Sequence, residues 1–140
     1  MANVIEITKA QISAYNDKNW SKVKDVLAAD AVYDEKGMQR RIQGADAIIE
    51  VWQGAAKALN TKATIVREFA SGDTAVFELV WKGVHSGSLQ TPTGIIPASN
   101  KPIDIPACQV IQVDGGKIKS ISHYFDMLTL LTQIIGATKG

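Results

Sequence analysis

Hydrophobic residues recur every three or four positions over the first part of the chain, which is the spacing of one face of a helix. This spacing predicts a helix that begins near Val4, a second over residues 20–28 and a third over residues 45–59. The third has the clearest apolar stripe. A brief strand is expected at 31–34, followed by a polar turn region over 35–43. The first part of the chain is therefore expected to be mainly helical.

After Thr61 the hydrophobic pattern changes to every second residue, which indicates strands. Four long strands are expected, over residues 62–70, 74–87, 102–113 and 117–125. We expect a loop over 88–101 and a closing helix over 127–135. Helices in one part of a chain and strands in the other predict an α+β domain, with the helices on one face of a curved sheet. No linker divides the chain, so we expect a single domain over residues 1–140.

Composition narrows the class of protein. Hydrophobic residues make up 46% of the 140 residues and charged residues 21%, as in ordinary globular domains. A net charge of +1 gives no field to attract nucleic acid or an anionic membrane, and no apolar run is long enough to cross a bilayer. The single cysteine, Cys108, excludes an internal disulfide, and the first residues lack the features of a secretory signal. We therefore expect a cytoplasmic protein that binds neither nucleic acid nor membranes.

Metal and cofactor signals are weak. The chain has two histidines, His85 and His123, and no cluster with metal-ligand spacing. Cys108 lies within an expected strand with no neighbouring base, so it is interpreted as a small buried residue. No glycine-rich loop opens a helix in the manner of nucleotide sites. The sequence therefore predicts neither a metal nor a cofactor.

Four polar side chains stand in apolar surroundings: His85, Gln109, His123 and Asp126. Unbroken alternation puts His85 on the face of Trp81, and puts Gln109 on the apolar face of its own strand. His123 and Asp126 are three positions apart, so a regular strand points them to opposite faces. We favour Asp126 for the interior. There, burial would raise its pKa and make it a candidate general base, whereas the pattern alone fits the N-cap of the closing helix better.

Aromatic residues in the helical half are more often core than ligand contacts. A buried tyrosine hydroxyl nevertheless needs a partner, so Tyr15 or Tyr33 facing a cavity would bind or orient a substrate. The candidate ligand contacts are Tyr15, Tyr33, Trp52, Trp81, Gln109 and His123.

Several short motifs together resemble one family. Gly-Val-His-Ser-Gly stands at 83–87, Thr-Pro-Thr-Gly at 91–94 and Asp-Gly-Gly-Lys-Ile at 114–118. Tyr-Phe-Asp follows at 124–126, and the closing segment 130–136 has one residue more than the family's usual ending. With the order of elements, these motifs resemble the fold of nuclear transport factor two. More narrowly they resemble the SnoaL-like polyketide cyclases, also called ester cyclases, over nearly the whole chain.

The resemblance implies a cone-shaped curved antiparallel sheet, with three N-terminal helices packed on its concave face and a short C-terminal helix. It also implies a cofactor-free cyclase that closes a polyketide ring by intramolecular aldol condensation, and a homodimer. The general base would be Asp126, and His85 would face the pocket. Gln109 stands where many relatives carry an acidic residue, which departs from the pattern. Tyr15 would lie at the mouth of the pocket.

Two hypotheses follow. In the first, Asp126 removes a proton next to a carbonyl, His85 and Gln109 donate hydrogen bonds to the enolate oxygen, and ring closure or isomerisation follows. In the second, the chain is a non-catalytic protein that binds an apolar small molecule or serves as a dimeric scaffold. The second predicts a cavity that Asp126 does not contact, with Asp126 used as a helix cap. Neither hypothesis identifies the substrate.

Overall fold

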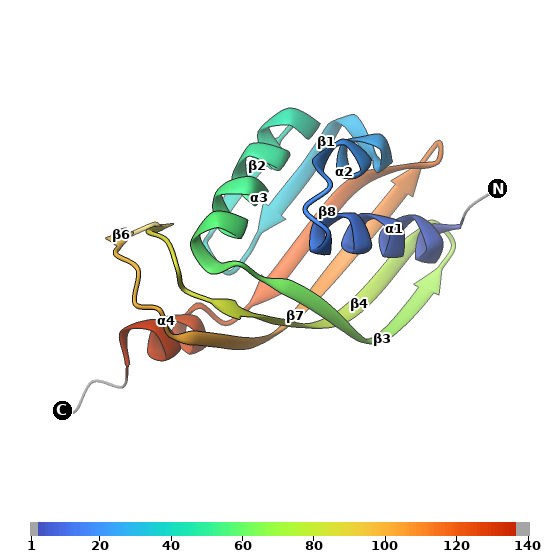
Figure 1. Cartoon of the computed structure of the whole chain (residues 1–140). Coiled ribbons are helices and arrows are strands. Elements are labelled where there is room, and N and C mark those ends of the chain that lie inside the picture. Colours follow the sequence, from blue (N-terminus) through green and yellow to red (C-terminus); the bar gives the residue numbers. More distant parts are fainter. Residues whose placement is uncertain (1–2, 137–140) are drawn as a thin grey trace.

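The computed structural model describes residues 3–136. Three N-terminal helices lie on one face of a curved sheet, and a fourth helix lies at one end (Figure 1). The helices are α1 (Val4–Asn16), α2 (Trp20–Val26), α3 (Ala45–Leu59) and α4 (Met127–Ile135). The strands are β1 (Leu27–Glu35), β2 (Arg40–Gln43), β3 (Lys62–Ser71), β4 (Thr74–Val84), β5 (Leu89–Thr91), β6 (Gly94–Ile96), β7 (Pro102–Asp114) and β8 (Lys117–Phe125). The predicted α+β class is confirmed.

The main sheet has six strands in the order β2-β1-β8-β7-β4-β3. Strands β8, β7, β4 and β3 pair with one another in antiparallel fashion, as expected, but β1 pairs with β8 in parallel. The sheet is therefore mixed and not entirely antiparallel. The parallel pair is possible because the two strands are joined by most of the chain and not by a hairpin. β5 and β6 form a separate hairpin outside this sheet.

Several elements differ from the sequence prediction. Helix α2 ends at Val26, where β1 begins, so β1 is longer at both ends than the expected strand. The region expected to be a polar turn contains β2, and the region expected to be a loop contains the β5–β6 hairpin. β2 is an edge strand whose residues are all exposed or half-buried. Its polar sequence therefore lacks the apolar alternation by which strands are recognised.

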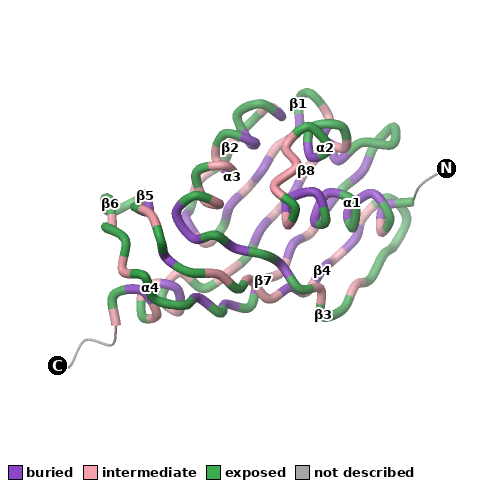
Figure 2. The backbone as a smooth tube through the Cα atoms, viewed as in Figure 1, coloured by how far each residue is buried: buried purple, intermediate pink, exposed green. Residues whose placement is uncertain are grey.

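The core lies between the helices and the inner face of the sheet, where Figure 2 shows buried positions alternating with exposed ones along the strands. On β4 the inward residues Ala75, Phe77 and Leu79 are fully buried, whereas the outward Val76 and Val80 are half-buried. The alternation confirms that one face of this strand packs under α1 and the other does not.

A close approach between α3 and β4 shapes one side of the fold. A Cβ atom at Gly83 would lie 2.2 Å from the carbonyl oxygen of Leu59. The pairing of β4 with β7 continues without a shift from Trp81 to Val84, so Gly83 marks this contact and not a bulge. Glycine is needed because any side chain would push the end of α3 off the sheet.

The end of α1 is tied to the start of β3. The Asn16 amide donates to the carbonyl of Ala63 at 2.9 Å and accepts from its N–H at 2.8 Å. The ammonium group of Lys18 also donates to the carbonyl of Thr61. These bonds hold the last turn of α1 over the segment 60–63, and so bring Tyr15 to Thr61.

Candidate functional site

A cavity of about 680 Å³, lined mainly by apolar atoms, lies between the helices and the inner face of the sheet. Its walls come from helices α1, α3 and α4, the hairpin strand β5, and strands β1, β2, β4, β7 and β8. The side chains predicted to contact a ligand all line it: Tyr15, Tyr33, Trp52, Trp81, Gln109 and His123. The fold brings them together from both halves of the chain; their role as ligand contacts stays a prediction.

His123 is the centre of a hydrogen-bond chain in the cavity wall. Its Nε2 lies 3.1 Å from the indole Nε1 of Trp81, and its Nδ1 lies 2.6 Å from the hydroxyl of Tyr33. An indole N–H only donates, so Nε2 must accept and the imidazole proton must be on Nδ1. His123 then donates to Tyr33. Both nitrogens are occupied, so His123 has no free position with which to act as a base.

The chain of donors ends at Glu35. The Tyr33 hydroxyl donates to Glu35 Oε2 at 3.0 Å, and Arg40 Nε donates to Oε1 at 2.5 Å. Only 8% of the Glu35 side chain is exposed, whereas 38% of the Arg40 side chain is. Glu35 is thus a nearly buried carboxylate on the wall of an apolar cavity, with one protein donor on each oxygen.

The pKa shifts agree with this assignment of protons. Burial lowers the pKa of His123 from 6.5 to about 3, because the charged imidazolium would lie away from water. The pKa of Tyr33 is raised well above its usual 10.0, chiefly by burial and then by the charge and hydrogen bond of Glu35. At neutral pH His123 is therefore uncharged and Tyr33 keeps its proton.

Tyr15 forms a second polar group in the cavity. Its hydroxyl lies 3.1 Å from the hydroxyl of Thr61, and its ring packs edge-on against Trp81 and Trp52, with centroids 5.3 and 6.1 Å away. Burial is the main cause of a raised pKa at Tyr15. Neither hydroxyl has another hydrogen-bond partner within residues 3–136. Because one hydrogen suffices for the bond between them, the other is free to reach a ligand.

Asp126 is not a buried base. It lies exposed at the start of α4, where Oδ1 accepts from the N–H of Leu128 at 2.9 Å and Oδ2 accepts from the Thr129 hydroxyl at 2.8 Å. The Thr129 bond is the main cause of a lowered pKa, with the opposing effect of burial next. Asp126 does not line the cavity. The expected burial and raised pKa of Asp126 are therefore wrong, and the alternative reading as a helix cap is right.

A bulge in β8 decides which residue faces inward. The register with β7 shifts by one residue between the pairs Val113–Ile118 and Gln112–Ser120, so Lys119 is the extra residue. Ile118 is buried, and alternation from it would carry Asp126 to the inner face. After the bulge the inward positions are instead Ile121 and His123. The bulge thus gives His123 the place that the sequence prediction gave to Asp126.

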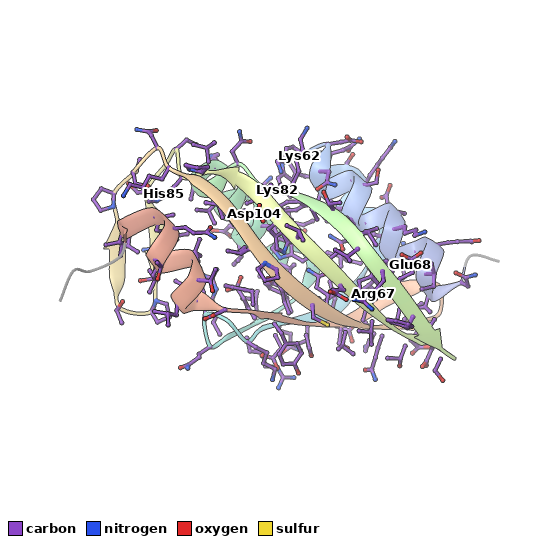
Figure 3. All side chains as sticks on the ribbon, turned by 90° about the horizontal axis from the view of Figure 1, so that it is seen from below. Lys62, Arg67, Glu68, Lys82, His85 and Asp104 are labelled. Atoms are coloured by element: carbon purple, nitrogen blue, oxygen red, sulfur yellow. The ribbon has the colours of Figure 1, made fainter. Side chains whose placement is uncertain are left out.

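His85 is buried but does not line the cavity. Strand β4 ends at Val84, so the alternation from Trp81 that predicted a cavity-facing His85 stops one residue too early. Its Nδ1 accepts from the N–H of Ser99 at 3.2 Å and lies 2.9 Å from the Ser99 hydroxyl. Figure 3 shows His85 at the end of the molecule where α4 lies. Its contacts fasten the two ends of segment 85–99, so the predicted place of His85 in the pocket is wrong.

Among the cavity residues that the sequence did not single out are Gln11, Glu35, Arg40 and Thr61. A signal for Glu35 was present. It lies two positions after Tyr33, so it shares the face of Tyr33 in any strand that continues past Asp34. Arg40 follows from β2, which the polar sequence concealed. Gln11 lies at helical spacing from Val4 and Ile7, so its position does not separate it from the residues that form the core, and nothing in the pattern distinguished Thr61.

Residues 3–136 contain no group of three or more histidine, cysteine or acidic side chains that could hold a metal ion. In the same part of the chain, no helix combines the length and hydrophobicity needed to span a membrane.

Comparison with models of protein families gave a match over nearly the whole chain. The model of the SnoaL-like polyketide cyclase family matches residues 5–134. The chain belongs to the SnoaL-like polyketide cyclase family, as its motifs suggested. A comparison with curated proteins gave no match.

Solved structures share the fold at low sequence identity. A candidate polyketide cyclase from Pseudomonas putida KT2440 is 19% identical, with a TM-score of 0.83, and the match covers 96% of this chain and 99% of that one. One from Xanthomonas campestris pv. campestris is 22% identical, with a TM-score of 0.82 and coverage of 94% and 96%. A protein with a ketosteroid isomerase-like fold from Catenulispora acidiphila DSM 44928, crystallised with trimethylamine, is 22% identical, with a TM-score of 0.77 and coverage of 92% of each chain. These structures confirm the fold.

Proposed function

We propose that the protein is a cofactor-independent enzyme that removes a proton next to a carbonyl group of an apolar small molecule, with Glu35 as the general base. One observation carries the proposal: a nearly buried carboxylate faces a mainly apolar cavity and is held there by two donors. Such an arrangement positions a base while keeping water away from the proton it removes. The family membership and the trimethylamine bound to the Catenulispora relative also support a small-molecule ligand.

In the proposed reaction, a carboxylate oxygen of Glu35 takes the proton from the carbon beside the carbonyl. The C–H electron pair forms the C=C bond of the enolate, and the π pair of the carbonyl moves to its oxygen. The free hydroxyl hydrogen of the Tyr15–Thr61 pair donates to this enolate oxygen. The enolate carbon then attacks a second carbonyl of the same molecule, as in an aldol ring closure, and Glu35 returns its proton to the new alkoxide. Return of the proton to a different carbon would give an isomerisation.

The other residues of the network act as positioning residues in this proposal. Arg40 and Tyr33 fix the two carboxylate oxygens of Glu35. His123 orients the Tyr33 hydroxyl, and Trp81 fixes the tautomer of His123. Asp126 takes no part.

Deuterium uptake tests the base without knowledge of the natural substrate. 1-Tetralone and related apolar ketones are incubated with the protein in D2O, and exchange at the carbon beside the carbonyl is followed by mass spectrometry. We expect Glu35→Gln to abolish the protein-dependent exchange. Glu50→Gln is the matched control, because Glu50 is an exposed carboxylate on the same cavity. Exchange that persists in Glu35→Gln would show that Glu35 is not the base.

A second candidate function, a non-catalytic protein that binds an apolar small molecule, is favoured by two observations. Asp126 caps α4 and makes no contact with the cavity, as that hypothesis predicted. Glu35 is also paired with Arg40. Ligand binding by the wild-type protein without deuterium uptake in any ketone of the panel would favour this function over the enzyme.

We also propose that the protein is a homodimer formed through the outer face of the sheet. No helix within residues 3–136 covers that face, on which Val76, Val80 and Val110 are half-buried. Charged residues such as Lys82 and Asp104 run along the same strands (Figure 3). Light scattering after size exclusion should give twice the chain mass of 15.1 kDa. A monomer at micromolar concentration would contradict the dimer.

A further inference from the structure

Two buried glutamines on the cavity wall have carbonyl oxygens without a partner. Gln11 is 4% exposed and Gln109 is 3% exposed, and the Oε1 atom of each has no hydrogen bond within residues 3–136. Buried polar atoms are nearly always paired in folded proteins, so each unpaired atom needs an explanation. The other two such atoms, on Thr8 and His85, belong to residues that do not line the cavity. Both glutamines line the same cavity, so a ligand held there could satisfy their oxygens.

The fold puts each glutamine next to one polar group of the proposed site. Gln109 pairs directly with His123 across β7 and β8, so their side chains stand side by side on the inner face. Gln11 lies one helical turn before Tyr15 on the same face of α1. Helix α1 packs on β7, which brings the two elements that carry the glutamines together. A ligand held by both amides would therefore lie beside the His123 chain and close to the Tyr15 hydroxyl.

The chemistry of two amides selects the ligand group. An unpaired carbonyl oxygen requires a donor, which excludes a ketone, an ether or a carboxylate as its partner. An ammonium group would donate, but the nearby carboxylate of Glu35 is already paired with Arg40, so the cation would be buried without a counter-charge. A hydroxyl is neutral, donates one hydrogen and accepts others. It can donate to one amide oxygen and accept from the other amide nitrogen, and it still fits if either amide rotates.

We propose that Gln11 and Gln109 form a subsite for a neutral hydroxyl group, so that the ligand is an apolar carbonyl compound that carries a hydroxyl. This subsite rests on the proposed function, since it assumes that the cavity holds the substrate. It adds that the substrate is oriented by a hydroxyl that binds the glutamines and stands on a different carbon from the one that loses its proton.

A pair of matched ligands tests the subsite by binding alone. 4-Hydroxy-1-tetralone and 4-methyl-1-tetralone differ only in a hydroxyl and a methyl group of similar size, and their affinities are measured by titration calorimetry. We expect the wild-type protein to bind the hydroxy compound about tenfold more tightly than the methyl compound. Gln11→Leu and Gln109→Leu should each remove most of this preference without weakening the methyl compound. Gln90→Leu is the matched control, because Gln90 lines the cavity at an exposed position.

Folding of the variants is checked by thermal unfolding. Each substitution removes an unpaired buried oxygen, so Gln11→Leu and Gln109→Leu should be at least as stable as the wild type. Preference for the hydroxy compound that survives both substitutions overturns the subsite, as does a wild-type protein that binds both compounds equally or neither. Equal binding would mean that water molecules, and not the ligand, bond the two amide groups. That result would not affect the proposal that Glu35 is the base. Loss of the preference together with no deuterium uptake would keep the subsite and refute the enzyme.

Discussion

Acidification should destabilise this protein through His123. The folded state holds the imidazole uncharged, since burial lowers its pKa from 6.5 to about 3. The unfolded chain takes up a proton at this residue below pH 6.5, whereas the folded chain does not until about pH 3. Between these values the unfolded state binds more protons, so the free energy of unfolding falls as the pH falls. The contribution of the neutral His123 to the free energy of unfolding is fully present above pH 6.5.

The size of the effect follows from the shift. Each pH unit below the unfolded pKa costs about 1.4 kcal/mol, so at pH 4.5 the loss is about 2.7 kcal/mol. This is a large share of the roughly 5–15 kcal/mol by which native proteins are stable. We therefore expect a steep loss of stability between pH 6.5 and 4.5.

Urea unfolding of the wild type and of His123→Gln at pH 7.5 and 4.5 isolates this residue. A glutamine amide can accept from Trp81 and donate to Tyr33 but does not titrate. The variant should be less stable at pH 7.5, and the difference between the two proteins should shrink by about 2.7 kcal/mol at pH 4.5. Because the chain has two histidines, the variant also assigns the NMR signal of His123, which should not move between pH 8 and 4.5. A stability difference that is equal at both pH values would refute a neutral, buried His123.

Two further substitutions test the packing and the cap. Gly83→Ala should destabilise the protein by about 3 kcal/mol in urea unfolding, because the new methyl group would lie 2.2 Å from the Leu59 carbonyl oxygen. Gly54→Ala is its control: a Cβ there meets nothing within 4 Å, so the change should stabilise helix α3, and equal losses in both variants would contradict the close approach. Asp126→Ala should lower the melting temperature by a few degrees through loss of the cap and leave deuterium uptake unchanged. Uptake that disappears with Asp126 would restore it as the base in place of Glu35.

The local sequence pattern predicted those helices and strands whose hydrophobic residues keep one spacing over the whole element. The helices Ala45–Leu59 and Met127–Ile135 and the strand Lys117–Phe125 have the predicted bounds. The start of β1 was different. Leu27 continues the helical stripe of α2, yet it is a strand residue because it pairs with Ile118, far along the chain. No local pattern records such a partner.

In the candidate site, too, some residues follow from local patterns and others depend on distant strand pairing. Aromatic and polar residues of the cavity could be named from the sequence because each interrupts or continues an apolar face. The choice between His123 and Asp126 could not be made, since it depends on one extra residue, Lys119, whose place is set by pairing with β7. Glu35 was missed because the edge strand β2, which extends β1 to that position, has no apolar signature.

The position of β8 in the sheet has a consequence for synthesis on the ribosome. β8 follows every other strand in the chain, yet it lies between β1 and β7 in the middle of the sheet. Until it emerges, β2-β1 and β7-β4-β3 are two separate pieces, each with an unpaired inner edge open to other chains. The bond between Tyr33 and His123 joins residues 90 positions apart, so the cavity network forms at the end of folding. High contact order of this kind is associated with slow folding. A chain that stops before residue 117 should therefore aggregate and not fold as a smaller sheet.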